Sequence, residues 1–143
     1  MAREIFRGRV PEGLLYDTRY DMWVREEGDE VVIGATTLGI FRAGEIIAFT
    51  AKPQGAEVDA GRGLGTVECA KTVLAVHAPL SFVLTQANEE AEEKPALVND
   101  DPYGKGWMVR GQPRDWINDR ALLVDAAAYR RHVLAQEPDG EIV

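Results

Sequence analysis

Lys71 and Cys69 are the residues whose chemistry stands out, two positions apart in the stretch Val67-Glu68-Cys69-Ala70-Lys71-Thr72-Val73. β-prone residues flank a short corner there, so the stretch predicts a hairpin with the Lys71 ammonium in water at its tip. An amine at the tip of a rigid, protruding element can anchor a covalently attached group, whereas most exposed lysines are only solvated surface. The rest of the sequence is needed to choose between these two interpretations.

Cys69 is the single cysteine of the chain, which excludes an internal disulfide and a multi-thiol metal site. A nearby cation such as Lys71 makes a thiol more reactive, which is one interpretation of Cys69. A free cysteine more often fills space in a strand, and that is the expectation here. The cysteine content also fits a reducing compartment.

The remaining candidates predict no catalytic set. His77 and His132 lie far apart without companions at metal-binding spacing, so structural or surface roles are expected. The glycine-rich segment 61–65 resembles a nucleotide-binding loop, but no helix is expected after it, and the anion-binding helix N-terminus is therefore missing. These absences favour a binding module or a non-catalytic carrier over an enzyme.

Composition limits the partners. A chain of 143 residues fits one domain with a real core, and 45% hydrophobic with 28% charged residues is typical of a globular protein. The net charge of −8 would repel nucleic acid. No apolar run reaches membrane-spanning length and no signal-peptide pattern is present, so we expect a cytoplasmic monomer without a membrane partner.

Many short β-rich runs are separated by Gly and Pro turns, and they must position the hairpin. Ordered structure is expected to start at 14–16, and the runs expected as strands are 23–26, 30–34, 46–50, 57–58, 64–68, 72–76, 82–85 and 107–110. The run 46–50 is continuously apolar, which predicts burial on both faces or beneath a helix. The pattern predicts a mainly β fold, an antiparallel β-sandwich or flattened barrel.

The helical and irregular segments complete a single domain over residues 1–143. Thr36 and Thr37 can cap a short inserted helix that runs to about Arg42 and is closed by Gly44, and Asp125 can cap a C-terminal helix over 126–136. The β body is expected over about 14–112 and the helical tail over about 113–136. The expected irregular segments are a loose leader over 1–13, a solvated acidic loop over 89–94 and a frayed end over 138–143.

The stretch Glu68 to Val73 resembles the lipoylation motif Glu-Ser-Val-Lys-Ala-Val of the glycine cleavage H-protein family. Further segments agree in order and spacing over about 14–136, among them Trp23-Val24, Gly34-Ala35-Thr36, Gly44-Glu45-Ile46, Ala78-Pro79, Asn88-Glu89 and Pro95 to Trp107. The resemblance implies a barrel-sandwich hybrid fold, lipoate covalently attached to Lys71, and Glu68 as a recognition residue for a lipoate ligase or lipoyl transferase.

Three residues depart from the family pattern around the implied arm. Met22 stands where the family usually has Glu before the tryptophan, Arg42 replaces a His, and Ala75 replaces an Asp four residues after the lysine. A protonated amine is stabilised by carboxylates and destabilised by a cation, so these changes suit an uncharged or anionic cargo. Arg42, Met22, Cys69 and Ala75 are thus candidate arm or cargo contacts, and Arg42 as a surface residue without such contact remains equally open.

The segment 47–53 looks more similar to the H-protein-like lipoate-binding proteins of bacterial sulfur oxidation. This resemblance implies a carrier that moves a sulfur-bound intermediate between enzymes of a heterodisulfide-reductase-like system. The alternative is an H protein that carries the aminomethyl intermediate among glycine cleavage enzymes, including dihydrolipoyl dehydrogenase. A biotinyl carrier is disfavoured because biotin sites have Met on both sides of the lysine, and an unmodified binding module would require a bare Lys71.

A last departure concerns attachment of the arm. Phe82 stands where the lipoyl fold commonly has Gly, eleven residues after the lysine. Because that glycine belongs to the surface that lipoyl ligases read, the resemblance implies poor recognition by the general lipoylation machinery and is compatible with a dedicated ligase.

Overall fold

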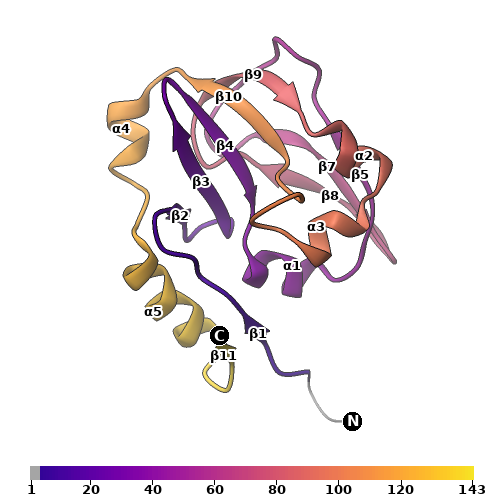
Figure 1. The fold of residues 1–143 in the computed structure, drawn as a ribbon, viewed down its shortest axis with the longest axis vertical. Helices are drawn as coiled ribbons and strands as arrows, with labels where there is room; N and C mark the ends of the chain where they lie inside the picture. The colour runs from indigo at the N-terminus through magenta and orange to yellow at the C-terminus, as the bar shows by residue number, and fades with distance from the viewer. Residues whose placement is uncertain (1–3) are drawn as a thin grey trace.

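The computed structural model describes residues 4–143, which form a β-sandwich with helices at its edges (Figure 1). One sheet has six strands in the order β2-β3-β4-β10-β9-β6, and the other has three in the order β5-β7-β8. All strand pairs in these two sheets are antiparallel. The fold is therefore the expected mainly β, lipoyl-domain-like barrel-sandwich hybrid.

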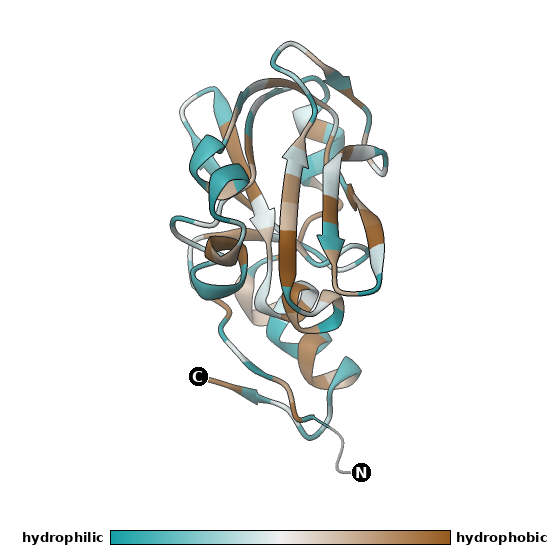
Figure 2. Cartoon of the chain, turned by 90° about the vertical axis from the view of Figure 1, so that its right-hand side faces the viewer, coloured by the Kyte–Doolittle hydropathy of each residue, from teal (hydrophilic) through white to brown (hydrophobic). Residues whose placement is uncertain are grey.

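The strands are short, as the Gly and Pro turns predict. Their bounds are β1 Arg7–Gly8, β2 Leu15–Asp17, β3 Met22–Glu27, β4 Glu30–Ala35, β5 Ile46–Ala51, β6 Glu57–Val58, β7 Gly63–Cys69, β8 Thr72–His77, β9 Phe82–Ala87, β10 Val109–Pro113 and β11 Glu141–Ile142. The helices are α1 Thr37–Ala43, α2 Glu89–Glu93, α3 Ala96–Asp100, α4 Trp116–Arg120 and α5 Ala126–Gln136. Hydrophobic residues follow the strands, while the turns are largely hydrophilic (Figure 2).

Two hydrophobic clusters hold the fold together. The larger lies between the two sheets, where Ile33, Phe82 and Leu84 of the six-stranded sheet meet Phe49 and Val67 of the three-stranded sheet. The smaller cluster covers the opposite face of the six-stranded sheet and contains Phe6, Tyr16, Trp23, Leu38, Tyr129 and Val133. This second cluster fixes α1 and α5 against the β2–β3 region, which matters for the pocket described below.

Of the two candidate caps of the inserted helix, Thr36 is the cap of α1 and Thr37 is its first residue, and the predicted cap Asp125 is confirmed for α5. The Thr36 hydroxyl accepts a hydrogen bond from the Gly39 amide at 3.1 Å, and Gly44 ends α1 with a φ of 85°. Asp125 accepts from the Ala128 amide at 2.9 Å at the start of α5. These signals are local, because a side-chain oxygen satisfies an amide that lacks a partner in the first turn of the helix.

The prediction that both chain ends are loose is wrong for the residues that the structure describes. Phe6 and Val10 are buried, and β1 pairs in parallel with β11, which was expected to fray. Strands β1 and β11 thus lie side by side at one end of the molecule, near α5 (Figure 1). Residues 1–3 of the predicted leader lie outside the described residues.

The acidic run is a helix rather than the predicted loop. The Asn88 side chain accepts from the Ala91 amide, and Ala91 is buried. Carboxylates in the first turn also complement the partial positive charge of a helix N-terminus. Glu92 accepts a hydrogen bond from the Ala51 amide at 3.1 Å, so this helix covers the end of β5.

Other local predictions also need correction. Strand β5 is not buried on both faces, since Ile47 is half exposed. The turn-rich segment after residue 95 contains α3, and the strand predicted over 107–110 begins at Val109 as β10. The short helix α4 lies within the predicted helical tail over about 113–136 but was not predicted as a separate helix. Within residues 4–143, no helix is long and apolar enough to cross a membrane.

Candidate functional site

Lys71 lies at the tip of the hairpin formed by β7 and β8. The strands pair in register up to Cys69 opposite Thr72, which leaves Ala70 and Lys71 as the two turn residues. The Lys71 side chain is exposed. A two-residue connection of this kind holds the lysine at the end of a paired, rigid element.

The two neighbours in the motif have different environments. Glu68 is exposed on β7, opposite Val73, where another protein can reach its carboxylate. Cys69 is a free, buried cysteine that pairs with Ile46 of β5. Burial of Cys69 fits the filler interpretation of this thiol better than the reactive one.

The return strand β8 is an edge strand of its sheet, and it carries unusual exposed apolar side chains. Val73 is 61% exposed and Leu74 is 41% exposed. Leu74 also lines a cavity of about 270 Å³ between the hairpin, α1 and the β2–β3 connection. An extended strand rises about 3.3 Å per residue, so this cavity begins roughly 10 Å from the hairpin tip along β8.

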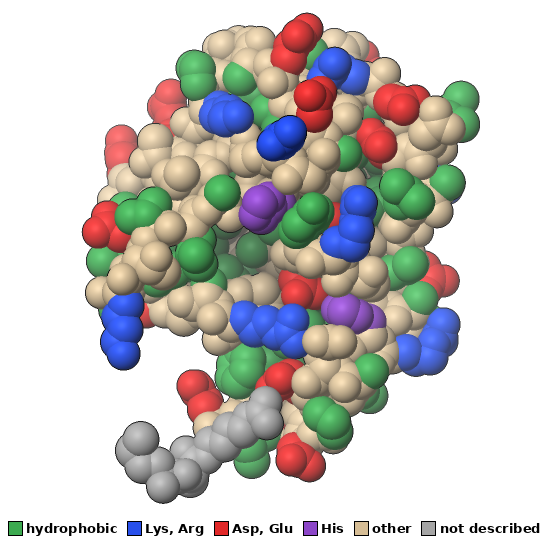
Figure 3. Space-filling view, turned by 180° about the vertical axis from the view of Figure 1, so that it is seen from behind, with side chains coloured by type: hydrophobic (Ala, Val, Ile, Leu, Met, Phe, Trp, Pro, Cys, Tyr) green, Lys and Arg blue, Asp and Glu red, His purple; other side chains and the backbone are tan. Residues whose placement is uncertain are grey.

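The cavity is mainly apolar and open to solvent. Its apolar side chains come from both sheets and from α1, and they include Met22, Ile40, Ile46, Val67, Leu74 and Met108. The space-filling view shows the hollow, with charged side chains along one rim (Figure 3). A cavity of this composition can hold an apolar chain with a small polar end.

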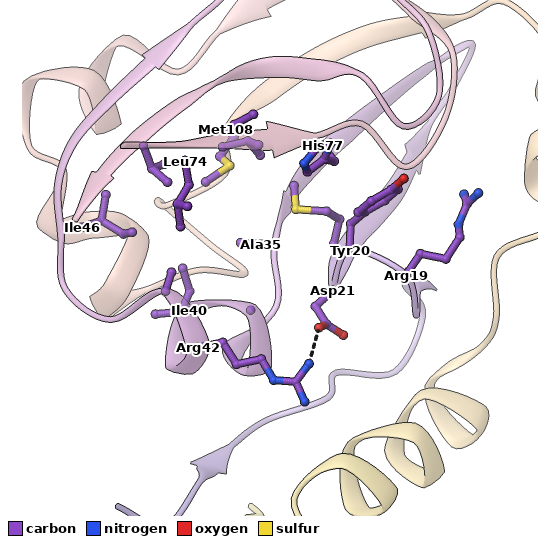
Figure 4. A pocket seen from close by; sticks show the side chains of 16 residues that line it. Arg19, Tyr20, Asp21, Ala35, Ile40, Arg42, Ile46, Leu74, His77 and Met108 are labelled. Atoms are coloured by element: carbon purple, nitrogen blue, oxygen red, sulfur yellow. Dashed lines mark hydrogen bonds and ion pairs between the residues drawn. The ribbon is translucent and has the colours of Figure 1, made fainter. Parts of the chain in front are cut away.

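The polar end of the cavity is formed by Asp21 and Arg42 (Figure 4). Arg42 Nη1 donates to Asp21 Oδ2 at 3.3 Å, and Arg42 Nη2 donates to Gln136 Oε1 at 2.9 Å. Asp21 Oδ1 accepts from the Tyr129 hydroxyl at 2.8 Å and lies 3.1 Å from His132 Nε2. A carboxylate buried in this way is stabilised by several donors at once.

Tyr129 holds Asp21 from the interior of α5. Burial, and then the negative charge of Asp21, raise the pKa of the Tyr129 hydroxyl well above its ordinary value. The hydroxyl therefore keeps its proton and donates a hydrogen bond to the carboxylate. Its oxygen is also 2.7 Å from the Thr36 hydroxyl, which connects Asp21 to the start of α1.

The structure brings together part of the predicted site. Met22, Arg42 and Ala75 all line the cavity, although they lie on β3, α1 and β8. Cys69 is not among its lining residues, and Lys71 stands apart at the tip. The Arg42 guanidinium is paired with Asp21, so the cavity is less cationic than the residue types around Lys71 indicate.

Among the cavity residues that sequence reasoning missed are Asp21, Tyr20 and His77. Asp21 and Tyr20 come from the β2–β3 connection, and His77 comes from the end of β8. Asp21 is the non-glycine residue with a positive φ, 57°, among residues 4–143. Asp tolerates this conformation, which is seen in the structure and is not marked by a sequence pattern. The convergence of these residues depends on the tertiary fold.

Phe82, which stands where the lipoyl fold commonly has Gly, is fully buried. Its ring lies against Gly111 of β10, where an added Cβ would overlap Phe82 Cδ2. A ligase bound to the surface cannot read a side chain in the core. The implied poor recognition by general lipoylation machinery therefore has no support from the Phe82 side chain.

No group of three or more His, Cys, Asp and Glu side chains suited to a metal ion occurs within the described range 4–143. The exposed lysine and the apolar cavity at the base of its hairpin instead fit a long, flexible, covalently attached arm.

Comparison with known proteins identifies related chains. The family model described as Glycine cleavage H-protein matches residues 14–136. A glycine cleavage system H protein of Bacteroides thetaiotaomicron is 37% identical over 120 residues, which cover 84% of this chain and 94% of that protein. One of Halorhodospira halophila is 40% identical over 126 residues, which cover 87% and 95%.

A solved structure agrees with these relatives. The crystal structure of a glycine cleavage system H protein from Mycobacterium marinum superposes with a TM-score of 0.75 at 28% identity, covering 87% of this chain and 98% of that one.

Proposed function

Because this chain belongs to the glycine cleavage H-protein family, whose members carry lipoate on a lysine and have no catalytic activity of their own, we propose that its lipoyl arm is attached to Lys71. The observation that carries this proposal is the position of Lys71, an exposed residue of a two-residue turn at the tip of a paired hairpin. When bound, the lipoyl group supplies a dithiol that takes up and releases a cargo.

The residues of the chain divide the remaining work. The paired strands β7 and β8 present Lys71 away from the body, and Glu68 offers a carboxylate beside it to a lipoate ligase or lipoyl transferase. The cavity that includes Leu74 and Met22 can shelter an apolar arm from water between encounters with partner enzymes.

We propose glycine cleavage as the pathway, with the cargo in its aminomethyl form. The support comes from the relatives, which are named glycine cleavage system H proteins and match nearly their whole length. The partners are then glycine cleavage enzymes, including dihydrolipoyl dehydrogenase. The comparisons give no support to the narrower resemblance to sulfur-oxidation carriers.

A sulfur-bound cargo on a heterodisulfide-reductase-like system is the second candidate. Met22 and Ala75 line the cavity and add no carboxylate to it, which favours a cargo without positive charge. The ion pair between Arg42 and Asp21 weakens this candidate, because the positive charge of Arg42 is already balanced. A sulfur-oxidation gene neighbourhood would support it.

Intact-mass and peptide mass spectrometry of protein purified from its native host test the attachment. We expect the mass of one lipoyl group on the peptide that contains Lys71. Lys71→Arg should remove it, whereas Lys94→Arg, at another exposed lysine, should keep it. Native protein with a bare Lys71 would refute the carrier proposal.

The lipoylated protein then tests the pathway. Incubation with glycine and glycine decarboxylase should load the arm in the wild type and in Lys94→Arg. Loading by a heterodisulfide-reductase-like system but not by glycine decarboxylase would favour the second candidate.

A further inference from the structure

Two short segments outside residues 14–136, the range that the family model matches, pair with each other. Strand β1 lies parallel to β11, and the Glu141 amide donates to the Phe6 carbonyl at 2.9 Å. We call residues 6–10 together with residues 140–143 the clasp. Both halves of the clasp are therefore additions to the part of the chain that the family model describes.

The first half of the clasp holds α1 at two points. At the start of the helix, the Thr37 hydroxyl donates to the Arg9 carbonyl at 2.9 Å and accepts from the Arg9 amide at 3.1 Å. Towards the end of the helix, the Phe41 ring meets the Phe6 ring edge to face, with centroids 5.3 Å apart. Phe6 is fully buried, so the second contact is part of the smaller hydrophobic cluster.

The clasp also connects α1 with α5. Arg130 of α5 donates to the Val10 carbonyl at 2.8 Å. Gln136 ends α5 directly before the turn that leads to β11, and its Oε1 accepts from Arg42 Nη2 at 2.9 Å. The two halves of the clasp thus restrain α1 from both of its ends.

Helix α1 has open space on both sides. On one side, Ile40 and Arg42 line the apolar cavity beside the hairpin (Figure 4). On the other side, Ile40 and Phe41 line a second cavity of about 400 Å³, together with Gly44 and Asn99. A side chain that borders a cavity lacks packing partners there, so α1 is restrained less than a helix inside a core.

The helix itself is too short to be stable alone. It has seven residues, of which Leu38 is buried, and an isolated helix of this length is not stable in water. Asn99 fixes the chain that follows the helix, because it donates to the Gly44 carbonyl at 2.9 Å and accepts from the Ile46 amide at 2.8 Å. Tertiary contacts, including those of the clasp, therefore decide where α1 lies.

We propose that α1 is a lid on the apolar cavity and that the clasp is its latch. Opening moves α1 towards the second cavity, and the pairing of β1 with β11 and the contact between Phe6 and Phe41 oppose this movement. The inference rests on the proposed function only in giving the cavity a tethered arm to admit. The latch then sets how often the arm enters or leaves, while Lys71 sets where it is attached.

A buried thiol in the cavity tests the lid in unmodified protein. Met108 lines the cavity and is only 2% exposed, so Met108→Cys in a Cys69→Ala background places one thiol where a reagent arrives after opening. Labelling by N-ethylmaleimide is followed by intact mass. Phe6→Ala and deletion of residues 141–143 loosen the clasp from its two halves, so the test stands even where one variant fails to fold.

Both clasp variants should be labelled about three- to tenfold faster, the range expected for the loss of one aromatic pair or one or two hydrogen bonds. The Ile40 and Gly44 amides, which donate to the Thr36 and Ile40 carbonyls, should exchange with heavy water faster by a similar factor. Val58→Ala is the matched control, because Val58 of β6 is buried between the two sheets. This control should lower Tm without faster labelling.

Two results would overturn the inference. One is unchanged labelling in the folded clasp variants. The other is equal acceleration by Val58→Ala at an equal loss of Tm, which would mean that the thiol reacts through global unfolding rather than through a local opening. A native protein with bare Lys71 would refute the carrier function and leave the labelling result standing, so the two failures are distinguishable.

Discussion

Tyr20 stacks on His77, with ring centroids 4.8 Å apart and ring planes inclined by 19°. Tyr20 belongs to the β2–β3 connection and His77 to the end of β8, so the contact joins the two sheets beside the cavity. The Arg19 guanidinium lies 5.5 Å from the centre of the Tyr20 ring on this connection. The base of the hairpin is thereby tied to the cavity wall that carries Asp21.

Loss of this stack should destabilise the fold modestly. Tyr20→Ala removes the ring and should lower the free energy of unfolding by about 0.5–1.5 kcal/mol beyond the loss from reduced burial. Tyr20→Phe keeps the ring and should retain most of this stabilisation. Urea unfolding monitored by circular dichroism measures the free energy of unfolding of both variants. Equal losses in the two variants would show that the hydroxyl, and not the stacked ring, is what stabilises the contact.

Glu68 should matter for modification rather than for stability. Its carboxylate is exposed on β7, so Glu68→Ala should change the free energy of unfolding by less than about 0.5 kcal/mol. The rate of lipoylation by a purified ligase, measured by intact mass, should fall severalfold. Glu57→Ala, at an exposed carboxylate on β6, is the control and should be modified at the wild-type rate.

The sequence predicts those parts of the fold that depend on neighbouring residues. Thr36 caps α1 from one residue away and Gly44 ends it, and the strands around Lys71 are consecutive along the chain. Each signal acts within a few residues, so composition and spacing are sufficient to detect it. The position of Lys71 in the hairpin turn follows from the same local pattern.

The cavity and the paired ends could not be predicted in this way. Asp21 meets Tyr129 from 108 positions away, and β1 pairs with β11 across almost the whole chain. Residue types alone indicated neutral or cationic surroundings for the arm, because the compensating carboxylate of Asp21 becomes a neighbour of Arg42 only on folding. Long-range pairings of this kind leave no periodic pattern in the sequence.

Tyr129 should make the protein sensitive to alkaline pH. Its pKa is raised in the folded state, mainly by burial, whereas in the unfolded chain a tyrosine loses its proton near pH 10. Above that pH the unfolded state binds fewer protons than the folded state, so stability falls as pH rises. Tyr16 and Tyr103, whose pKa values are also raised by burial, act in the same direction.

Tyr129→Phe tests this contribution. At neutral pH the variant should lose about 1.5–3 kcal/mol, because Asp21 loses a buried donor. Above pH 10 its decline in stability should be shallower than that of the wild type by about 1.4 kcal/mol per pH unit. Thr36→Ala should also be less stable but should keep the wild-type slope, since the phenol remains. An unchanged slope in Tyr129→Phe would contradict the role of this hydroxyl.

Gly111 and Phe82 should be energetically coupled. Gly111 lies in β10 where the register against β9 shifts, and an added Cβ would overlap the Phe82 ring. Gly111→Ala should therefore cost about 1–3 kcal/mol by overpacking. Phe82→Leu alone should also be destabilising, because a fully buried ring is replaced by a smaller side chain.

The double variant Gly111→Ala/Phe82→Leu distinguishes this contact from a general loss of packing. The smaller side chain at position 82 makes room for the new methyl group, so the double variant should be more stable than the sum of the two single losses predicts, by at least about 0.5 kcal/mol. Urea unfolding of all four proteins gives the coupling energy. Strict additivity would mean that the two residues do not constrain each other.

Because Phe82 is buried, the lipoylation rate of folded Phe82→Leu should equal that of the wild type, and faster modification would restore a role for position 82 in ligase recognition.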